Sequence, residues 1–143
     1  MPPDIGKNLM ARHFIVTADG GSRGNPGAAA YGAVIYENDK IVKEIGAAIG
    51  QASNNVAEYS GLIAGLKGVN EIDPAATILV KMDSKLVVEQ MSGRWKVKHP
   101  NMQKLVKEAF AAHDPTLVSY QWIPREENSH ADSILNDVLD SGM

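Results

Sequence analysis

Four carboxylates stand where a charge could do chemistry. Asp19 follows a short apolar and β-branched run and precedes a segment with four glycines in eight residues, 20–27. Asp83 follows a second apolar run, and Glu58 and Asp132 fall near the starts of two predicted helices. A carboxylate at a strand end beside a flexible turn is well placed to bind a metal ion, because bare glycine backbone lets a bulky ligand approach.

Each of these carboxylates also has an ordinary structural explanation. Asp19 could be a turn residue and Asp83 a helix N-cap, while Glu58 and Asp132 could complement helix dipoles. A cluster of all four would destabilise the fold through like-charge repulsion unless cations neutralised it. The chain has no cysteine, and ligands that offer only oxygen favour hard ions such as Mg²⁺ or Mn²⁺. The set as a whole therefore predicts a site for such ions.

The elements that must position these carboxylates follow the order β-β-β-α-β-α-α-β-α. Three early strands are joined by short turns, and two later strands are reached through helices. We therefore expect an α/β fold with a mixed five-stranded sheet, three strands antiparallel and then two parallel, flanked by helices. Ligands of such sheets bind outside the carboxyl ends of the strands, where Asp19 and Asp83 are expected. The predicted strands are 13–19, 31–36, 41–49, 77–82 and 117–123, and the predicted helices are 54–69, 84–91, 101–112 and one that begins at Asn128 or Ser129.

Length and composition favour one domain in the cytoplasm. We expect the 143 residues to form a flexible N-terminal extension, 1–12, and a single domain, 13–143. The absence of cysteine fits a reducing compartment. No apolar stretch approaches the roughly 18 residues of a membrane span, and the N-terminus lacks the apolar core of a signal peptide. No membrane contact is therefore expected.

Basic residues are concentrated in one part of an acidic chain. The net charge is −3, but the segment 81–107 holds seven lysines and arginines against two carboxylates. Such a segregated basic patch suggests a phosphate-binding surface, and a solvated helix face is the alternative. Within this segment, residues 94–100 are predicted to form a basic connector between two helices.

Four motifs in this order resemble those of type 1 ribonuclease H. They lie within residues 13–136, which cover nearly the whole chain, and the four together are far more specific than any one alone. The predicted order of strands and helices also resembles that fold. The residues of the four motifs are most similar to those of bacterial members of the actinobacterial type. The motifs are Ala-Asp-Gly-Gly-Ser-Arg-Gly-Asn-Pro-Gly at 18–27, Asn-Asn-Val-Ala-Glu at 54–58, Met-Asp-Ser-Lys at 82–85 and Asn-Ser-His-Ala-Asp at 128–132.

The resemblance implies that Asp19, Glu58, Asp83 and Asp132 are the metal ligands of an endonuclease. It implies hydrolysis of the RNA strand of RNA–DNA hybrids to 5′-phosphate and 3′-hydroxyl ends with two Mg²⁺ ions, for which Mn²⁺ could substitute, by a monomeric protein. Two such ions can activate a water and stabilise the leaving oxygen of one in-line displacement. Amide side chains can meet the 2′-hydroxyls that distinguish RNA. The expected substrate contacts are Gly20, Gly21, Ser22, Asn25, Ser53, Asn54, Asn55, Lys85, Arg94, Trp95, Lys96, Lys98 and Asn128.

Three departures from the family pattern bear on these expectations. Lys85 stands where many members have Gln, so a contact to a base edge could become a contact to a phosphate. The long basic protrusion of some members is shortened to residues 94–99, in which Trp95 could either stack on the DNA strand or belong to the core or rim. Trp122 stands where many members have a loop His.

The missing loop His leaves a role for Arg125. Its guanidinium could meet a phosphate, which makes it a further candidate catalytic residue, and a surface Arg paired with Glu126 or Glu127 is the alternative. The remaining histidines at 13, 99 and 113 are expected at the surface.

Other functions remain open at this point. A hybrid-binding module of the same fold without cleavage is the nearest alternative, and the intact carboxylate set argues against it. A DNA strand-transfer enzyme of related fold would need more chain for DNA binding and assembly. A metal-dependent protein that binds sugars or nucleotides is the alternative without nucleic acid.

Overall fold

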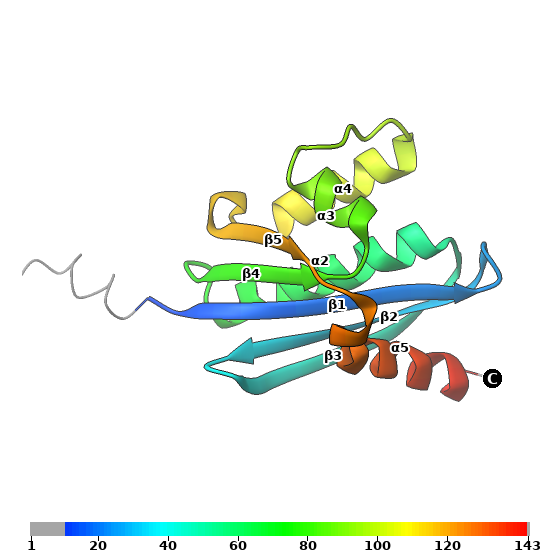
Figure 1. Cartoon of the computed structure of the whole chain (residues 1–143), viewed down its shortest axis with the longest axis horizontal. Coiled ribbons are helices and arrows are strands. Elements are labelled where there is room, and N and C mark those ends of the chain that lie inside the picture. Colours follow the sequence, from blue (N-terminus) through cyan, green and yellow to red (C-terminus); the bar gives the residue numbers. More distant parts are fainter. Residues whose placement is uncertain (1–10, 143) are drawn as a thin grey trace, which may run out of the picture.

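The computed structural model describes residues 11–142 and contains one five-stranded sheet (Figure 1). Its strand order is β3-β2-β1-β4-β5, with β1, β2 and β3 antiparallel and with β4 parallel to both β1 and β5. This confirms the predicted mixed sheet. Most of the expected N-terminal extension, residues 1–10, lies outside the described residues. The strands are β1 His13–Arg23, β2 Gly27–Glu37, β3 Lys40–Ala52, β4 Thr77–Met82 and β5 Val118–Trp122.

Helices cover both faces of the sheet (Figure 1). α2 packs on β1 and β2 from one side, where α4 packs against it, and α5 packs on β1, β2 and β3 from the other side. The predicted order of elements is confirmed, with two short 3₁₀ turns added at Pro115–Leu117 and Arg125–Glu127. The helices are α2 Asn54–Ile72, α3 Lys85–Met91, α4 Pro100–Ala112 and α5 Ser129–Ser141.

The main core lies between the sheet and α2. Phe14, Val16 and Ala18 alternate along β1 and are fully buried on that side, as expected for a strand with a period of two. α2 approaches closely because it carries small residues there. A Cβ added at Gly65 would lie 2.5 Å from Val16, and one at Gly68 would lie 2.6 Å from Ile35.

β1 is longer than predicted, which corrects the expectation that Asp19 ends a strand. The strand continues through the glycine-rich segment to Arg23, with Asp19 paired to Gly32 of β2, and only Gly24–Pro26 form the turn. The parallel pairing with β4 stops at Thr17. Asp19 therefore lies just past the end of the β1–β4 ladder, although its own strand goes on.

Gly20 lies within the extended strand at a place where tertiary packing requires a small residue. A Cβ on Gly20 would lie 2.1 Å from the carbonyl carbon of Ala57 in the first turn of α2. Gly20 thus lets the start of α2 approach β1, which a side chain would prevent. Local turn propensity is overridden by this contact and by the pairing with β2.

One structural alternative is excluded, and one smaller expectation is corrected. The N-cap of α3 is Ser84, whose hydroxyl accepts from the Val87 amide, so Asp83 is not the cap. His113 is not at the surface, because only 3% of it is exposed. Its ring nitrogens lie 3.1 Å from Asn70 Oδ1 and 2.8 Å from the Ala76 carbonyl oxygen. These contacts tie the end of α4 to α2 and to the segment before β4.

Candidate active site

The four predicted carboxylates lie around one cavity of about 330 Å³. They come from four different elements: Asp19 from β1, Glu58 from α2, Asp83 from the residue after β4, and Asp132 from α5. The fold therefore brings together side chains that are 113 positions apart in the chain. The cavity is lined by Asp19, Gly20, Gly21, Ser22, Arg23, Asn54, Glu58, Asp83, Arg125, Asp132, Leu135, Asn136 and Leu139.

Asp19 is the most enclosed of the four, with 9% of its surface exposed. Burial raises the pKa of its carboxyl to about 8, and the charge of Asp83 together with the hydrogen bond and charge of Asp132 act in the same direction. The Gly20 amide, which donates to Oδ1 at 2.9 Å, opposes this rise. The raised pKa means that burial and the neighbouring carboxylates disfavour the charged form of Asp19.

Glu58 shows the same behaviour one turn into α2. Burial raises the pKa of its carboxyl to about 7; a hydrogen bond from Ser84 lowers it, and the charge of Asp83 raises it further. The Ser84 hydroxyl donates to Glu58 Oε1 at 3.2 Å and accepts from the Val87 amide, so it ties the start of α3 to α2.

Asn128, directly before α5, holds the Asp83 side chain in place. Its side-chain amide donates to Asp83 Oδ1 at 2.7 Å and to the Ala18 carbonyl at 2.9 Å. Only 1% of Asn128 is exposed, and its Oδ1 has no hydrogen-bond partner in the described structure. Asn128 was predicted to contact substrate, but the structure gives it contacts that join β1, the end of β4 and the start of α5.

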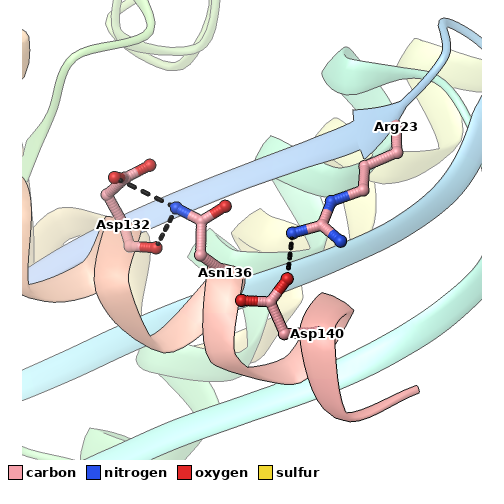
Figure 2. A network of polar contacts seen from close by, with 4 residues as sticks. All are labelled: Arg23, Asp132, Asn136 and Asp140. Atoms are coloured by element: carbon pink, nitrogen blue, oxygen red, sulfur yellow. Dashed lines mark hydrogen bonds and ion pairs between the residues drawn. The ribbon is translucent and has the colours of Figure 1, made fainter. Parts of the chain in front are cut away.

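Asp132 is supported by its own helix (Figure 2). The Asn136 side chain, one turn later in α5, donates to Asp132 Oδ2 at 3.2 Å and to its carbonyl at 3.0 Å. One turn further along, Asp140 accepts from Arg23 at 2.5 Å, which ties the end of β1 to α5.

Sequence reasoning missed Arg23 and Asn136, although both line the cavity. A signal for each was present in their spacing. Arg23 is four residues from Asp19 on a strand, and Asn136 is four residues from Asp132 on a helix. Both spacings place the two side chains on the same face of their element. Arg23 was overlooked because its segment was predicted to be a turn, in which that period does not apply.

Two amide side chains that are predicted to contact substrate join the β1–β2 turn to the start of α2. Asn54 Oδ1 accepts from the Ser22 amide at 2.8 Å and from its hydroxyl at 3.0 Å, while Asn25 Oδ1 accepts from the Asn54 amide at 3.1 Å. Ser53 is the N-cap of α2, and Asn55 is exposed beside it. The side-chain oxygens of Asn25 and Asn54 accept these bonds, and their side-chain nitrogens donate none of them. Asn54 lines the cavity, so this segment can offer amide donors near its rim.

The basic connector does not line the carboxylate cavity. Arg94 lines a separate cavity between α3, α4 and β5, and its guanidinium pairs with both carboxylate oxygens of Glu89, at 2.6 and 2.9 Å. Trp95 is 45% exposed, and Lys96 and Lys98 are exposed beside it. These side chains are available to a large ligand that extends beyond the carboxylates.

The carboxylate cluster fits divalent cations by its chemistry. Within residues 11–142 no three His, Asp or Glu side chains are already arranged to hold a metal ion. All four carboxylates nevertheless line one cavity, and they offer only oxygen ligands. Burial and the negative charge of Asp83 raise the pKa values of both Asp19 and Glu58. A hard cation would compensate for both effects.

Comparison with known proteins decides the family. The model described as reverse transcriptase-like matches residues 17–138. The ribonuclease HI of Halobacterium salinarum is 38% identical over 142 residues, which cover 96% of this chain and 67% of that protein. The chain belongs to the type 1 ribonuclease H family.

Mycobacterial and solved members of the type 1 ribonuclease H family are similar as well. The bifunctional protein Rv2228c of Mycobacterium tuberculosis is 53% identical over 130 residues, covering 89% of this chain but 35% of that protein. The chain thus spans about a third of the length of these relatives. Its structure matches the N-terminal ribonuclease H domain of Rv2228c with a TM-score of 0.86 and 50% identity, covering 92% of this chain and 96% of that one.

A solved complex adds information on a relative's ligand. The structure of LC11-RNase H1 in complex with an RNA/DNA hybrid matches with a TM-score of 0.83 and 34% identity, covering 90% of this chain and 98% of that one.

No helix within residues 11–142 is long and apolar enough to cross a membrane.

The stability of the metal-free ribonuclease H domain should fall as pH rises. Asp19 and Glu58 hold protons in the folded state up to about pH 8 and pH 7, whereas unfolded carboxyls release them near pH 4. The folded state therefore binds more protons between about pH 4 and pH 8, and the free energy of unfolding decreases across that window. Thermal unfolding in EDTA should show this decrease, with a shallower slope for Glu58→Gln.

The control for this pH dependence is Mg²⁺. A saturating concentration should restore the unfolding temperature of the parent protein at pH 8 more than that of Glu58→Gln, because binding to the folded state stabilises it. The same pH slope in the parent and in Glu58→Gln would show that Glu58 has an ordinary pKa.

Proposed function

We propose that the protein is a metal-dependent endonuclease that hydrolyses the RNA strand of RNA–DNA hybrids, leaving 5′-phosphate and 3′-hydroxyl ends. One observation carries the proposal: four carboxylates from four elements meet at one cavity in a chain of the type 1 ribonuclease H family. The related LC11-RNase H1, whose structure was solved in complex with an RNA/DNA hybrid, supports the choice of substrate.

Asp19, Glu58, Asp83 and Asp132 would hold two Mg²⁺ ions, with Mn²⁺ as a possible substitute. The bound ions would supply an activated water and charge stabilisation at the leaving oxygen. The chain's own residues orient these ligands. Asn128 donates to Asp83, and Asn136 donates to Asp132, so each carboxylate keeps one oxygen fixed. Such outer partners tune metal sites in general.

Recognition of the hybrid rests on surfaces around the cavity. Gly20, Gly21 and Ser22 line the cavity on β1, and the amide groups of Asn25 and Asn54 lie beside them. Amides at this rim can donate to 2′-hydroxyls, which distinguish RNA from DNA. Farther out, the exposed side chains of residues 94–98 can meet backbone phosphates, which position the duplex without reading its sequence.

A single experiment tests the proposed function. A labelled RNA–DNA hybrid is incubated with the protein beside matched duplex DNA and duplex RNA, with and without Mg²⁺. We expect cleavage of the RNA strand of the hybrid only when Mg²⁺ is present. Tight binding of the hybrid without cleavage would instead support a binding module of the same fold.

The setting of this activity is also a proposal. We infer that the protein acts as a monomer. We also infer that it acts in the cytoplasm, since the chain has no cysteine that would mark an oxidising compartment. Sedimentation of the purified protein tests the monomer.

Residues of the basic connector should bind phosphates. Replacement of Arg94, Lys96 and Lys98 by Ala should weaken hybrid binding, and each lost phosphate contact should lower the salt-dependence slope by about 0.9. Arg94 is expected to contribute least, because Glu89 already pairs with it. Affinity measured at several salt concentrations checks this expectation.

A matched control separates local contacts from net charge. Lys40 and Lys67 are exposed on β3 and α2 and do not line the carboxylate cavity. Their double replacement by Ala removes as many charges as replacement of Lys96 and Lys98 alone, and it should leave the slope nearly unchanged. If the connector variant and this control behave alike, the connector is only a solvated link between α3 and α4.

A further inference from the structure

Trp122 lies at the edge of the carboxylate cluster and contacts two groups there. It is the last residue of β5 and pairs with Met82, the last residue of β4. Its indole Nε1–H donates to the main-chain carbonyl of Asp83 at 3.1 Å. Its ring lies under the ammonium of Lys85, whose Nζ is 5.8 Å from the ring centroid.

The contact with Asp83 completes the pairing of the two strand ends. The Ile123 amide donates to the Met82 carbonyl at 2.9 Å, and the indole of Trp122 then satisfies the next carbonyl along, that of Asp83. Among residues 11–142, the β4–β5 pairing ends at Met82 and provides no strand partner for Asp83. The indole therefore fixes the peptide that leads from the carboxylate ligand into Ser84 and α3.

The contact with Lys85 acts on a second group of the site. Lys85 is exposed at the first position of α3, and none of the ion pairs among residues 11–142 includes it. A lysine ammonium over an aromatic face is held there by the ring's quadrupole. The ring thus limits the directions in which this long side chain can point, next to the cluster that Asp83 belongs to.

We propose that Trp122 is a positioning residue for both groups. Its indole N–H holds the Asp83 turn in the geometry that metal binding needs, and its ring holds Lys85 where the ammonium meets a phosphate of the hybrid. This inference rests on the proposed function. Trp122 does not line the carboxylate cavity, so its effect on hybrid binding passes through Lys85.

Two substitutions separate the two roles. Trp122→Phe keeps an aromatic ring but removes the N–H donor, so turnover should fall about 5-fold, as for one lost hydrogen bond, and half-saturation should need more Mg²⁺. Its affinity for the hybrid, measured in EDTA, should stay within about twofold because the ring remains. Trp122→Ala removes both contacts and should also weaken hybrid binding about 2- to 5-fold.

A double-mutant cycle tests whether the ring acts through Lys85. Lys85→Ala should weaken hybrid binding and lower the salt slope by about 0.9. Adding Trp122→Ala to Lys85→Ala should weaken binding no further, because the group that the ring positions is already gone. Phe110, 40% exposed on α4 and lining the separate cavity with Arg94, provides the control for loss of an exposed aromatic. Phe110→Ala should change neither turnover nor affinity.

The outcomes distinguish this inference from the proposed function. No cleavage by the parent protein would refute the proposed function. If the parent cleaves normally and Trp122→Phe has the same turnover and Mg²⁺ dependence, the role of the indole N–H is refuted, while the proposed function stands. Equal weakening by Trp122→Ala with and without Lys85 would show that the ring contacts the hybrid directly, which overturns the positioning of Lys85. Thermal unfolding of each variant verifies that it is folded.

Discussion

Asp19→Asn and Asp83→Asn are each expected to abolish cleavage of RNA–DNA hybrids while the fold is kept. An amide is close in shape to the carboxylate it replaces but lacks the negative charge that a divalent cation requires. Loss of an outer partner of a metal ligand already costs about 10–100-fold. Loss of a ligand should therefore cost more than about 100-fold in turnover, measured with the labelled hybrid at saturating Mg²⁺.

The metal-free stability of these variants gives an independent readout. Asp19 is buried next to Asp83 and Asp132, and burial and these charges raise its pKa to about 8. Asn is neutral without having to bind a proton when the chain folds, whereas Asp19 must bind one, so the free energy of unfolding without metal should rise or stay level near neutral pH in Asp19→Asn. A variant that is inactive but at least as stable as the parent is difficult to explain by misfolding.

The matched control for these substitutions is Asp137→Asn. Asp137 is exposed on α5, five residues after Asp132, and it does not line the cavity. Its substitution should leave turnover and Mg²⁺ dependence unchanged. Near-normal turnover of either Asp19→Asn or Asp83→Asn would remove the basis for placing the metal ions at this cluster.

Sequence reasoning succeeded where a local pattern and the tertiary structure agree. The run Thr77–Met82 is apolar and bounded by turn-forming residues, and it is a strand whose residues 78, 80 and 82 are buried. The meeting of the four carboxylates could be predicted because strand ends and helix starts of such a sheet share one edge. Elements with a clear period thus determined most of the topology and the position of the cavity.

The segment after Asp19 could not be predicted, because its conformation depends on a distant contact. Four glycines favour a turn locally. Gly20 is nevertheless extended, since the first turn of α2 packs where its side chain would be. His113 is a similar case: its partners, Asn70 and Ala76, lie about 40 positions away and leave no local signal.

Trp122 illustrates a third kind of limit. The sequence alone shows that a Trp side chain at this position cannot transfer a proton or carry a positive charge. Its two contacts depend on the register between β4 and β5, which places Trp122 opposite Met82 and therefore next to Asp83. A register of this kind comes from the whole sheet, so no local pattern could have indicated the role that we infer.

Arg125→Ala is expected to reduce turnover about 10–100-fold, on the order of 1.4–2.7 kcal/mol. Arg125 opens the 3₁₀ turn before α5 and lines the cavity with all four carboxylates. The ion pairs found within residues 11–142 do not include it, so the alternative pairing with Glu126 or Glu127 is absent there. An exposed guanidinium beside a carboxylate cluster can bind the phosphate that the cluster's cations attract.

The chemistry of the guanidinium makes the Arg125 prediction specific. Arg stays protonated near neutral pH, so Arg125 would hold substrate or stabilise charge and would not transfer a proton. Arg125→Ala should therefore lower turnover by the same factor across pH 6–9 and leave the affinity for Mg²⁺ nearly unchanged. Arg125→Lys should recover only part of the loss, because an ammonium lacks the planar fork that binds two phosphate oxygens.

Arg12, which precedes β1, provides a control that separates this role of Arg125 from a general loss of positive charge. Arg12 pairs with Glu37 at 2.7 Å, away from the cavity, and Arg12→Ala should keep parental turnover. If Arg125→Ala cleaves the hybrid as fast as the parent across the same pH range, Arg125 has no part in the reaction. Among residues 11–142, Arg23 would then be the one cationic side chain lining the cavity that could meet the phosphate, and it already pairs with Asp140.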